Sequence, residues 1–486
     1  MTFKFAVGTI LCVVLMAVFM PILAKDYQRR LGQYNEAATA NEAELRKVKI
    51  YKNITPTVYR PPNVLSVFSE GLEKRLGNSA KIELDNIPEV SAVSTRVNPY
   101  LSIFPTLDVS LTFKIVISIL ALLVACDVIS GERERGTLKL MLSGMVPRHQ
   151  ILLGKLLAGL MTLTVPATIA FITGLLILQL FPMVDLTGVD WIRIGLMYLV
   201  SLIFISAMYN FGLLFSCLTK RSVISLVLAL FVWVVCAIVI PNGSGYLARK
   251  IRPLELEEKL ESELGIVAEK LDSELHEINK KARSSWSGSS MGGAFGGRYV
   301  VVCDKRGREN LKKNYMLKEP VKIRYANRFL EVRHNYLNNL LKQKYLANNF
   351  SRISPISLYE NAMSALAGTD LANSQYFMSR VRIHRNKVIE YIRSKTDNFS
   401  SLTYFTRYKE GDWEGFQKIG YPKWNEKKLA ETSPLDLQDL PQFTYQVGAL
   451  KSLQRAIPDL GLLLFINVLF FALSFVAFMR YDARSD

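Results

Sequence analysis

Six long apolar runs divide this chain of 486 residues into membrane-like and soluble-like parts. Each run has enough apolar residues to form a helix across a bilayer core about 30 Å thick, for which roughly 20 residues are needed. The stretches between the runs are as charged as those of soluble proteins. The pattern therefore predicts a mainly α-helical integral membrane protein with six transmembrane helices, at residues 5–24, 111–129, 151–181, 191–218, 222–241 and 458–479.

The first run has a second interpretation, as a cleaved signal peptide, because Lys4 precedes it and Ala24 ends it. However, its apolar stretch exceeds the roughly 7–15 residues of a signal-peptide core, and Ile22 does not fit the small-residue cleavage pattern. We therefore expect a retained transmembrane helix.

The distribution of Lys and Arg predicts the orientation. Ten basic residues lie in the short segments on the side of both termini, whereas the short loop on the other side has none. Since short cytoplasmic loops are enriched in Lys and Arg, both termini are expected in the cytoplasm. The chain is thus divided into spans at 1–24, 111–129, 151–181, 191–218, 222–241 and 458–479, extracytoplasmic inserts at 25–110 and 242–457, a cytoplasmic loop at 130–150 and a cytoplasmic tail at 480–486.

The net charge first suggests a nucleic-acid-binding protein, because 60 Lys and Arg against 42 Asp and Glu give +18. Its location argues otherwise. The insert 242–457 has 36 basic and 24 acidic residues, so it carries two thirds of the excess outside the cytoplasm. Cytoplasmic nucleic acid is therefore excluded as a partner.

The span interiors lack the ionisable groups that ion-coupled transporters place deep in the membrane. Asn210 and Asn467 are the notable polar residues there, and an interhelical hydrogen bond is the expected role. The cysteines in the spans are interpreted as small buried hydrophobic residues. The scattered histidines offer no metal-ligand pattern.

Energy for transport must then come from another chain. No phosphate-binding loop of the type G-x-x-x-x-G-K-[ST] occurs, and no catalytic constellation stands out in the inserts. The chain is therefore expected to be a non-catalytic subunit, with no cofactor of its own and any ATP hydrolysed by a partner.

The most informative polar segment joins the second and third spans, with the sequence GERERGTLKLMLSGMVPRHQILLGKLL at residues 131–157. Glu132 and Glu134 lie in the first turn of a predicted short helix, where carboxylates oppose the positive end of the helix dipole. An apolar-rich stretch follows, and Gly144 with Pro147 ends it. From these residues alone, an interfacial helix on anionic lipid headgroups remains an alternative.

This segment resembles the coupling-helix region of type-2 ABC exporter permeases, which have the type V exporter fold. The resemblance extends to a subfamily with large extracytoplasmic inserts, and the matching stretches are distributed between residues 59 and 377. The further matching stretches are YRPPNVLSVFSEGLEKRLG at 59–77, NPYLSIFPTLD at 98–108 and SPISLYENAMSALAGTDLANSQYF at 354–377.

The resemblance implies that the motif helix docks in a groove of a cytosolic ATPase, which binds ATP and Mg²⁺ and whose closure tilts the spans. Charged residues would orient the docked helix, glycines would permit close approach, and apolar residues would pack against the ATPase. Arg148 and Lys155 would anchor the loop at the membrane surface. The implied coupling residues are Gly131, Glu132, Arg133, Glu134, Arg135, Gly136, Thr137, Leu138, Leu140, Met141 and Arg148.

The outer inserts carry weaker patterns. Residues 25–50 are predicted to continue the first span as a polar helix, a short helix is expected at 63–76, and 80–95 alternates like a strand. A stripe from Leu256 to Ile278 at three- and four-residue spacing predicts one arm of a helical hairpin or stalk. The glycine-rich residues 286–298 are predicted to form a flexible loop.

Residues 305–352 contain 13 basic and 3 acidic residues interleaved with tyrosines. Such a stretch would suit an anionic outer partner, with Lys342 and Lys344 as possible contacts. The alternative is a solvated face of an amphipathic helix whose core stripe includes Phe329. Further on, Gly368 in LAGTD is expected to end one helix while Thr369 or Asp370 caps the next.

These observations favour the transmembrane permease subunit of an ATP-driven exporter in the bacterial cytoplasmic (inner) membrane. The expected partners are two copies of an ABC ATPase, a second permease that is identical or paralogous, membrane lipid and an extracytoplasmic protein. One alternative is a mechanotransmission complex that moves an outer partner without translocation. Another is a membrane scaffold that has no ATPase.

Overall fold

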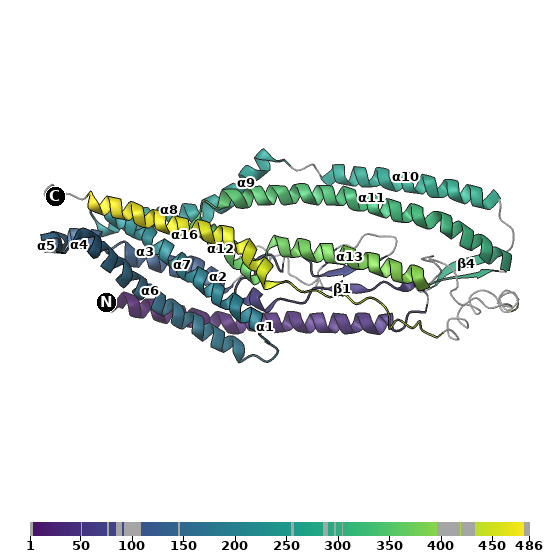
Figure 1. The fold of residues 1–486 in the computed structure, drawn as a ribbon, viewed down its shortest axis with the longest axis horizontal. Helices are drawn as coiled ribbons and strands as arrows, with labels where there is room; N and C mark the ends of the chain where they lie inside the picture. The colour runs from purple at the N-terminus through teal and green to yellow at the C-terminus, as the bar shows by residue number, and fades with distance from the viewer. Residues whose placement is uncertain are drawn as a thin grey trace.

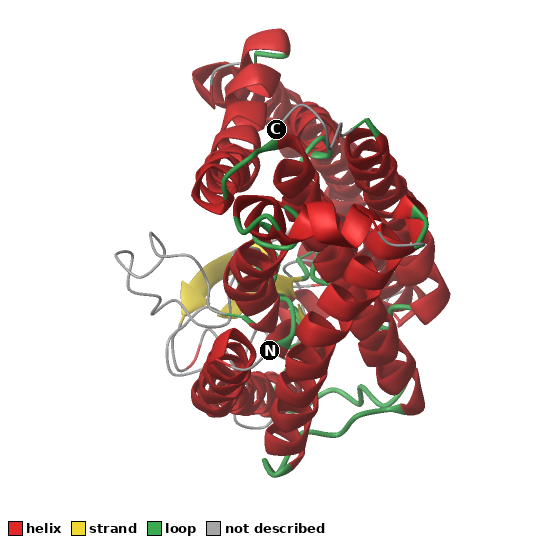
Figure 2. Cartoon of the chain, turned by 90° about the vertical axis from the view of Figure 1, so that its left-hand side faces the viewer, coloured by secondary structure: helices red, strands yellow, loops and turns green. Residues whose placement is uncertain are grey.

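Helices make up most of the described structure, and the few strands lie together in a small patch beside them (Figure 2). In this computed structural model, α1 begins and α16 ends at one end of an elongated molecule, and α10 and α11 extend to the other (Figure 1). The structure describes residues 3–49, 51–74, 77–83, 90–91, 108–143, 146–253, 257–284, 290–295, 298–303, 305–395, 418 and 433–480.

Six helical segments of the described chain are long and apolar enough to cross a membrane, which confirms the predicted number. Two of them contain a π-helical turn, at Phe113–Ile117 and Val235–Val239. The helices that form the six segments are α1 (Phe3–Leu45), α2 (Val109–Thr112) with α3 (Ser118–Ala125) and α4 (Ser130–Glu134), α6 (Arg148–Gln179), α7 (Gly188–Leu218), α8 (Ser222–Val234) with α9 (Ile240–Ile251), and α16 (Ala449–Met479).

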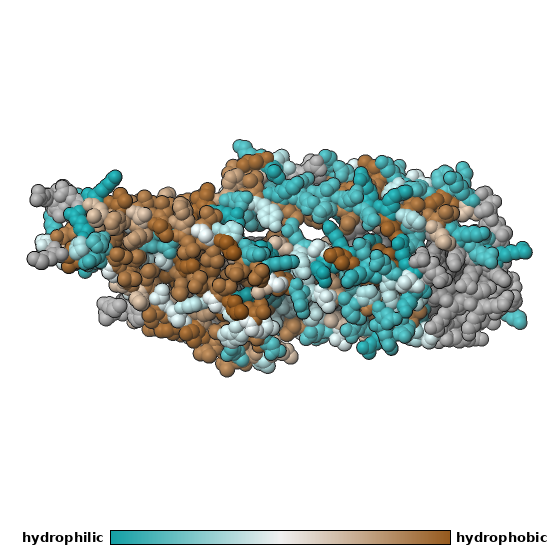
Figure 3. Space-filling model, viewed as in Figure 1, coloured by the Kyte–Doolittle hydropathy of each residue, from teal (hydrophilic) through white to brown (hydrophobic). Residues whose placement is uncertain are grey.

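Hydrophobic side chains cover one half of the molecule and hydrophilic side chains cover the other (Figure 3). The apolar half coincides with the six spans. A hydrophobic residue facing outward is favourable there because lipid, not water, surrounds it. The apolar half of the surface therefore indicates which part of the molecule would lie within the membrane.

The first helix extends well past its apolar part, as the sequence predicts for residues 25–50. Apolar residues at four- and three-residue spacing form a weak stripe along this helix that faces the rest of the protein. In this stripe Tyr27 is buried, and Leu31 and Tyr34 are half-buried. Tyr34 makes an edge-to-face contact with Tyr59, at 6.3 Å between ring centroids. This stripe attaches the outer half of α1 to the first insert.

The seventh helix lies at the centre of the span bundle and contacts α3, α6, α8 and α16. Its close approach to α6 depends on Gly159, since a Cβ there would lie 2.1 Å from the ring of Tyr209. Gly212 similarly meets Ala125 of α3. Small residues at such crossings let helices pack without side chains between them.

One helix of the large insert belongs to this bundle. The helix α12 (Pro355–Ala367) packs against both α7 and α16. Tyr359 is fully buried and stacks on Phe204 with 4.4 Å between ring centroids. The boundary drawn by hydropathy at residues 242–457 thus includes a helix that belongs to the membrane-side core.

The rest of the large insert forms a long stalk. The helices α10 (Glu257–Ser284) and α11 (Lys305–Ser351) pack against each other, which confirms the predicted hairpin. Along α10 the predicted apolar stripe is the less exposed face, with Val267 buried. Leu256 lies outside the described residues.

The connection between these helices differs from the prediction. Strands β4 (Ser290–Phe295) and β5 (Arg298–Cys303) form an antiparallel hairpin, so the flexible loop predicted for 286–298 is wrong over the part that forms strands. Glycines weaken a strand on average, but here the complementary run RYVVVC, rich in β-branched residues, supplies the pairing.

A small sheet joins the two inserts. Strands β1 (Thr57–Tyr59), β2 (Ser79–Lys81) and β3 (Val90–Ser91) are antiparallel in that order. The single strand predicted at 80–95 is therefore wrong in part, because β2 and β3 pair with each other; residues 84–89 and 92–95 lie outside the described residues. Val58 and Ala80 pack with Phe377 of α13 (Leu371–Lys395) in a second hydrophobic core.

The short helix expected at 63–76 is mostly wrong. Over the described residues 63–74 a single 3₁₀ turn forms, at Val64–Val67, and Asn63 caps it by accepting a hydrogen bond from the Leu65 amide at 3.0 Å. Gly71 follows with φ of +52°, a left-handed conformation that interrupts helical geometry. After this turn the amide of Leu72 donates to the carbonyl of Thr369 in the LAGTD segment, at 2.9 Å.

Candidate functional site

The predicted coupling segment lies at the end of the molecule opposite the stalk (Figure 1). It forms two short helices, α4 (Ser130–Glu134) and α5 (Thr137–Ser143). Gly136 separates them with φ of +76°, and this left-handed conformation favours glycine. A Cβ at that position would meet nothing within 4 Å, so the backbone, not crowding, explains the glycine.

Three consecutive charged residues of α4 bond to three different spans. Glu132 forms an ion pair with Lys155 of α6. Arg133 donates from Nη1 to the carbonyl of Thr219 at the end of α7, at 2.9 Å. The first residue of α8, Ser222, donates to Oε2 of Glu134 from its amide at 3.2 Å and from its hydroxyl at 3.0 Å.

The remaining charge of the motif closes the segment on itself. Arg135 donates from Nε to the carbonyl of Gly131 at 3.1 Å, and its Nη2 lies 3.6 Å from Oδ2 of Asp127. Gly131 is buried, and a Cβ there would lie 2.1 Å from Oδ1 of Asp127. Its close approach is therefore made within this chain.

The second short helix has an inner and an outer face. Leu138 is fully buried, and Met141 is half-buried against the core of the spans. Leu140 is 76% exposed, although it is apolar. Thr137 donates from its hydroxyl to the carbonyl of Glu132 at 3.2 Å, which ties α5 back to α4.

The two basic residues predicted as anchors bond to the protein itself. Arg148 donates from Nη1 to the carbonyl of Met479 at the end of α16, at 3.0 Å. Lys155 also donates to the carbonyl of Val128, at 3.1 Å, and its own carbonyl accepts from the hydroxyl of Tyr209 at 3.0 Å. Through these contacts the segment is connected to every span from the second to the fourth, to α8 and to α16.

Sequence reasoning missed one residue of this site. Ser216, fully buried on α7, accepts hydrogen bonds from the amides of Ile129 and Ser130, both at 3.0 Å, and donates to the carbonyl of Cys126 at 2.9 Å. It thereby joins the break between α3 and α4 to α7. Its only signal in the sequence is a hydroxyl within an apolar run.

The polar pair predicted inside the spans is present. Asn210 donates from Nδ2 to Oδ1 of Asn467, and the hydroxyl of Ser206 donates to the same oxygen at 3.3 Å. This confirms an interhelical hydrogen bond between α7 and α16. Among the described residues, no group of three or more His, Cys, Asp and Glu has the geometry to hold a metal ion.

Two of the further motif stretches, 59–77 and 354–377, meet at the stalk-side ends of the spans and form the insert junction. Thr369 donates from its hydroxyl to the carbonyl of Ser69 at 3.0 Å and accepts from the amide of Leu72 at 2.9 Å. Gly368 ends α12 with φ of +71°, and Asp370 accepts from the amide of Asn373 at 3.2 Å at the start of α13. The helix-ending role predicted for LAGTD is thus confirmed. The stretch 98–108 lies outside the described residues except for Asp108.

The two lysines suggested as contacts for an anionic partner, Lys342 and Lys344, lie exposed on α11. They come close to the end of that helix, and Arg352 just beyond it forms an ion pair with buried Asp459 of α16 at 2.7 Å. On the same helix Phe329 is half-buried, as the predicted core stripe requires.

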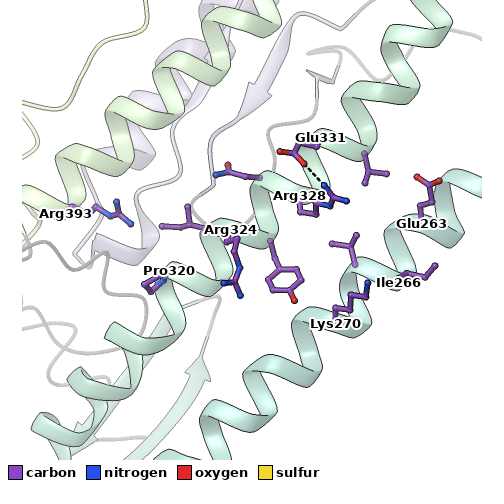
Figure 4. A pocket seen from close by; sticks show the side chains of 13 residues that line it. Glu263, Ile266, Lys270, Pro320, Arg324, Arg328, Glu331 and Arg393 are labelled. Atoms are coloured by element: carbon purple, nitrogen blue, oxygen red, sulfur yellow. Dashed lines mark hydrogen bonds and ion pairs between the residues drawn. The ribbon is translucent and has the colours of Figure 1, made fainter.

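A groove of about 920 Å³ separates the two stalk helices (Figure 4). Arg324 and Arg328 of α11 lie on one side, and Glu263 and Lys270 of α10 on the other, while Arg393 of α13 lies at the far end. Three of the four cations in its described lining are paired with carboxylates, so the groove has no clear preference for an anion. The pairs are Arg324–Glu274, Arg328–Glu331 and Arg393–Glu319.

The fold and this segment define a multi-pass membrane subunit whose short polar helices link several spans at one end. The family model described as "ABC-2 family transporter protein" matches residues 6–483, and the chain therefore belongs to that family. A search among curated proteins found no match. A permease of an ABC transporter is thus the class to which this protein belongs.

Proposed function

We propose that the chain is the transmembrane subunit of an ATP-driven exporter in the bacterial inner membrane, with its α4–α5 segment docked on a separate ATPase. ABC-2 membership supports an ATPase partner in general. The positive-inside pattern supports a cytoplasmic position for the end of the molecule that carries α4 and α5. Two ATPase copies and a second permease, identical or paralogous, would complete the assembly.

The observation that carries the proposal is the attachment of α4 to three spans. A displacement of α5 would pass through the Glu132–Lys155 ion pair to α6, through Arg133 to the end of α7, and through Glu134 to the start of α8. The Glu132–Lys155 pair and the Arg133 bond are partly shielded from water, so they are worth more than exposed surface contacts. The bonds between Glu134 and Ser222 lie at the surface and mainly orient α4 against α8. The segment would then act as a lever on the bundle.

The exposure of the motif residues favours one surface of the segment as the contact with the ATPase. The motif charges Glu132, Arg133 and Glu134 are engaged within the chain, whereas Leu140 is 76% exposed at the end of the molecule. Leu140 is thus the apolar residue of α5 that the chain itself leaves uncovered and that a partner could cover. The proposed contact with the ATPase is therefore made mainly by the outer face of α5, and α4 holds that face in place.

A mechanotransmission role is the second candidate, and the stalk favours it. The helix α11 has 47 residues, which corresponds to about 70 Å of α-helix at 1.5 Å per residue. Such a lever could move an extracytoplasmic protein with no substrate crossing the membrane. ATP-dependent accumulation of substrate in inverted vesicles separates the two: accumulation supports export, and its absence with an active ATPase supports mechanotransmission.

Replacement of Glu134 tests the coupling proposal. In Glu134→Lys the two hydrogen bonds to Ser222 are lost and a cation faces Arg221, so α4 should detach from α8. We expect the variant to stay in the membrane but to lose transport or ATPase co-purification. Glu134→Gln keeps an acceptor and is the matched control. Wild-type transport and co-purification by the lysine variant would refute the coupling role.

A further inference from the structure

A second polar site lies at the opposite membrane boundary, far from the coupling segment. A cavity of about 350 Å³ opens between the outer ends of α1 and α7 and the loops of the two inserts. This volume is near the lower limit of the roughly 300–1,000 Å³ typical of small-ligand pockets. Its lining includes Tyr27, Arg60, Glu73, Asp190, Arg193 and Tyr445.

Two arginines in this lining are buried and incompletely paired. Arg60 is 5% exposed, and its Nη2 has no hydrogen-bond partner among the described residues. Arg193 is 6% exposed; its Nη2 donates to the carbonyl of Val447 at 2.9 Å, but its Nε has no partner in the described chain. A buried charged donor without an acceptor is costly, so both groups favour an anionic ligand.

The nearby acidic groups are partly committed elsewhere. Oε1 of Glu73 accepts from Arg30 at 3.1 Å and from the amide of Asn63 at 2.9 Å. Asp190 accepts from the amide and hydroxyl of Thr187 as part of a helix cap. Neither therefore satisfies the open guanidinium atoms.

One acidic atom of the lining residues has no partner. Oε2 of Glu73 is buried and has no hydrogen-bond partner among the described residues, and the residue is only 9% exposed. Burial raises the pKa of Tyr445 to about 12, so this neighbouring phenol stays protonated. The cavity thus offers two guanidinium donors for an oxyanion and one carboxyl oxygen for a hydrogen-bond donor.

The position of the cavity indicates where such a ligand comes from. Tyr27 lies three residues after the apolar run that ends at Ala24, and Arg193 lies near the outer start of α7. Both residues are therefore at the level where spans leave the hydrocarbon and lipid phosphates lie. Guanidinium forks match phosphate oxygens in geometry and charge.

We propose that this cavity binds a phosphoethanolamine group, with its phosphate held by Arg60 and Arg193 and its ammonium by Glu73. At this depth the group belongs to a membrane lipid, and the soluble compound has the same chemistry. The site is independent of the ATPase coupling proposed above, so either proposal can fail alone.

The test uses the full chain purified in detergent. Thermal unfolding is followed against dihexanoyl phosphatidylethanolamine, the matching phosphatidylcholine, free phosphoethanolamine and inorganic phosphate. We expect the ethanolamine lipid to raise the melting temperature at concentrations about tenfold lower than the choline lipid, because a trimethylammonium cannot donate to Glu73. Stabilisation by free phosphoethanolamine at equal concentration would assign a soluble source, and stabilisation by the lipid alone would assign the lipid.

Two variants locate the site. Arg60→Gln and Arg193→Gln should each raise the stabilising lipid concentration about tenfold or more. Arg29→Gln, whose side chain is 71% exposed and lies outside the cavity, should leave it unchanged. The proposal is overturned if the choline lipid stabilises wild type equally well, a comparison that needs no variant. It is also overturned if folded Arg60→Gln and Arg193→Gln respond like wild type.

Discussion

The two ends of this molecule use charge in different ways. At the coupling end, three successive charged residues of α4 each bond to a different span; the contacts of Glu132 and Arg133 are partly shielded, and that of Glu134 lies at the surface. At the stalk end, most of the described basic residues of α11 are exposed; Arg328 pairs with Glu331 on the same helix, and Arg324 forms an exposed pair with Glu274 of α10. The few charges of the coupling segment thus connect several spans, whereas most charges on the stalk face solvent.

This contrast has an energetic basis. A pair at the surface competes with water and salt and is worth about 0–1 kcal/mol. When one partner of an ion pair or hydrogen bond shielded between helices is removed, the free energy of unfolding falls by more, about 1–3 kcal/mol. The other partner is then left buried without a hydrogen bond. We therefore expect substitutions to lower stability most at the buried crossing of α6 and α7, less at the insert junction, where the stretches 59–77 and 354–377 meet, and least on the stalk.

The largest effect is expected for Gly159→Val, at the crossing of α6 and α7. A Cβ at this position would lie 2.1 Å from the Tyr209 ring, so the helices must separate, at a cost of about 1–3 kcal/mol or more. Gly154→Val lies on the same helix with nothing within 4 Å and is the matched control. Thermal unfolding in detergent measures both; equal melting temperatures would contradict the close crossing.

An intermediate effect on stability is expected from a change of pH at the insert junction, where Asp108 accepts a hydrogen bond from the amide of Glu70. Burial raises the pKa of Asp108 to about 6, above the usual value of about 3.9, although the amides of Glu70 and Leu111 donate to its carboxylate and oppose this shift. The folded junction thus binds the proton more tightly than the unfolded chain. Its contribution to stability should be complete below about pH 4 and be lost as the pH rises through about 6.

Asp108→Asn should remove this component. The melting temperature of the variant should change less between pH 4 and pH 7 than that of wild type. An identical pH dependence in the two proteins would show that Asp108 is not the titrating group.

The smallest effect is expected on the stalk, for Lys342→Glu combined with Lys344→Glu. Both side chains are exposed on α11, so stability should change by less than about 0.5 kcal/mol. Unchanged transport and unchanged binding to anionic vesicles would support a solvated face. A clear loss of either would instead support the anionic-partner hypothesis and weaken the contrast between the two ends.

The sequence predicts the elements better than their connections. Six spans follow from hydropathy, and the α10–α11 hairpin follows from the spacing of residues such as Val267, because both depend on local periodicity. The partners of Glu132 and Glu134 could not be predicted, because Lys155 and Ser222 come from other helices and only packing brings them close.

The misplaced features have a common physical reason. The helix α12 falls within the predicted insert 242–457 because its 13 residues are too short to span a membrane, yet Tyr359 packs within the span bundle. The β4–β5 hairpin was missed because its first strand is rich in glycine, and only pairing with its partner strand makes it regular. In both cases tertiary contacts override the local pattern.

The central claim, that α5 is the docking surface for an ATPase, can be tested by site-specific photo-crosslinking in the co-expressed complex. A crosslinker at Leu140, which is 76% exposed on α5, should capture the ATPase subunit. The same crosslinker at Leu337, which is 44% exposed on α11, should not. Capture of the ATPase from Leu337, or no capture from Leu140 in a complex that hydrolyses ATP, would contradict the account.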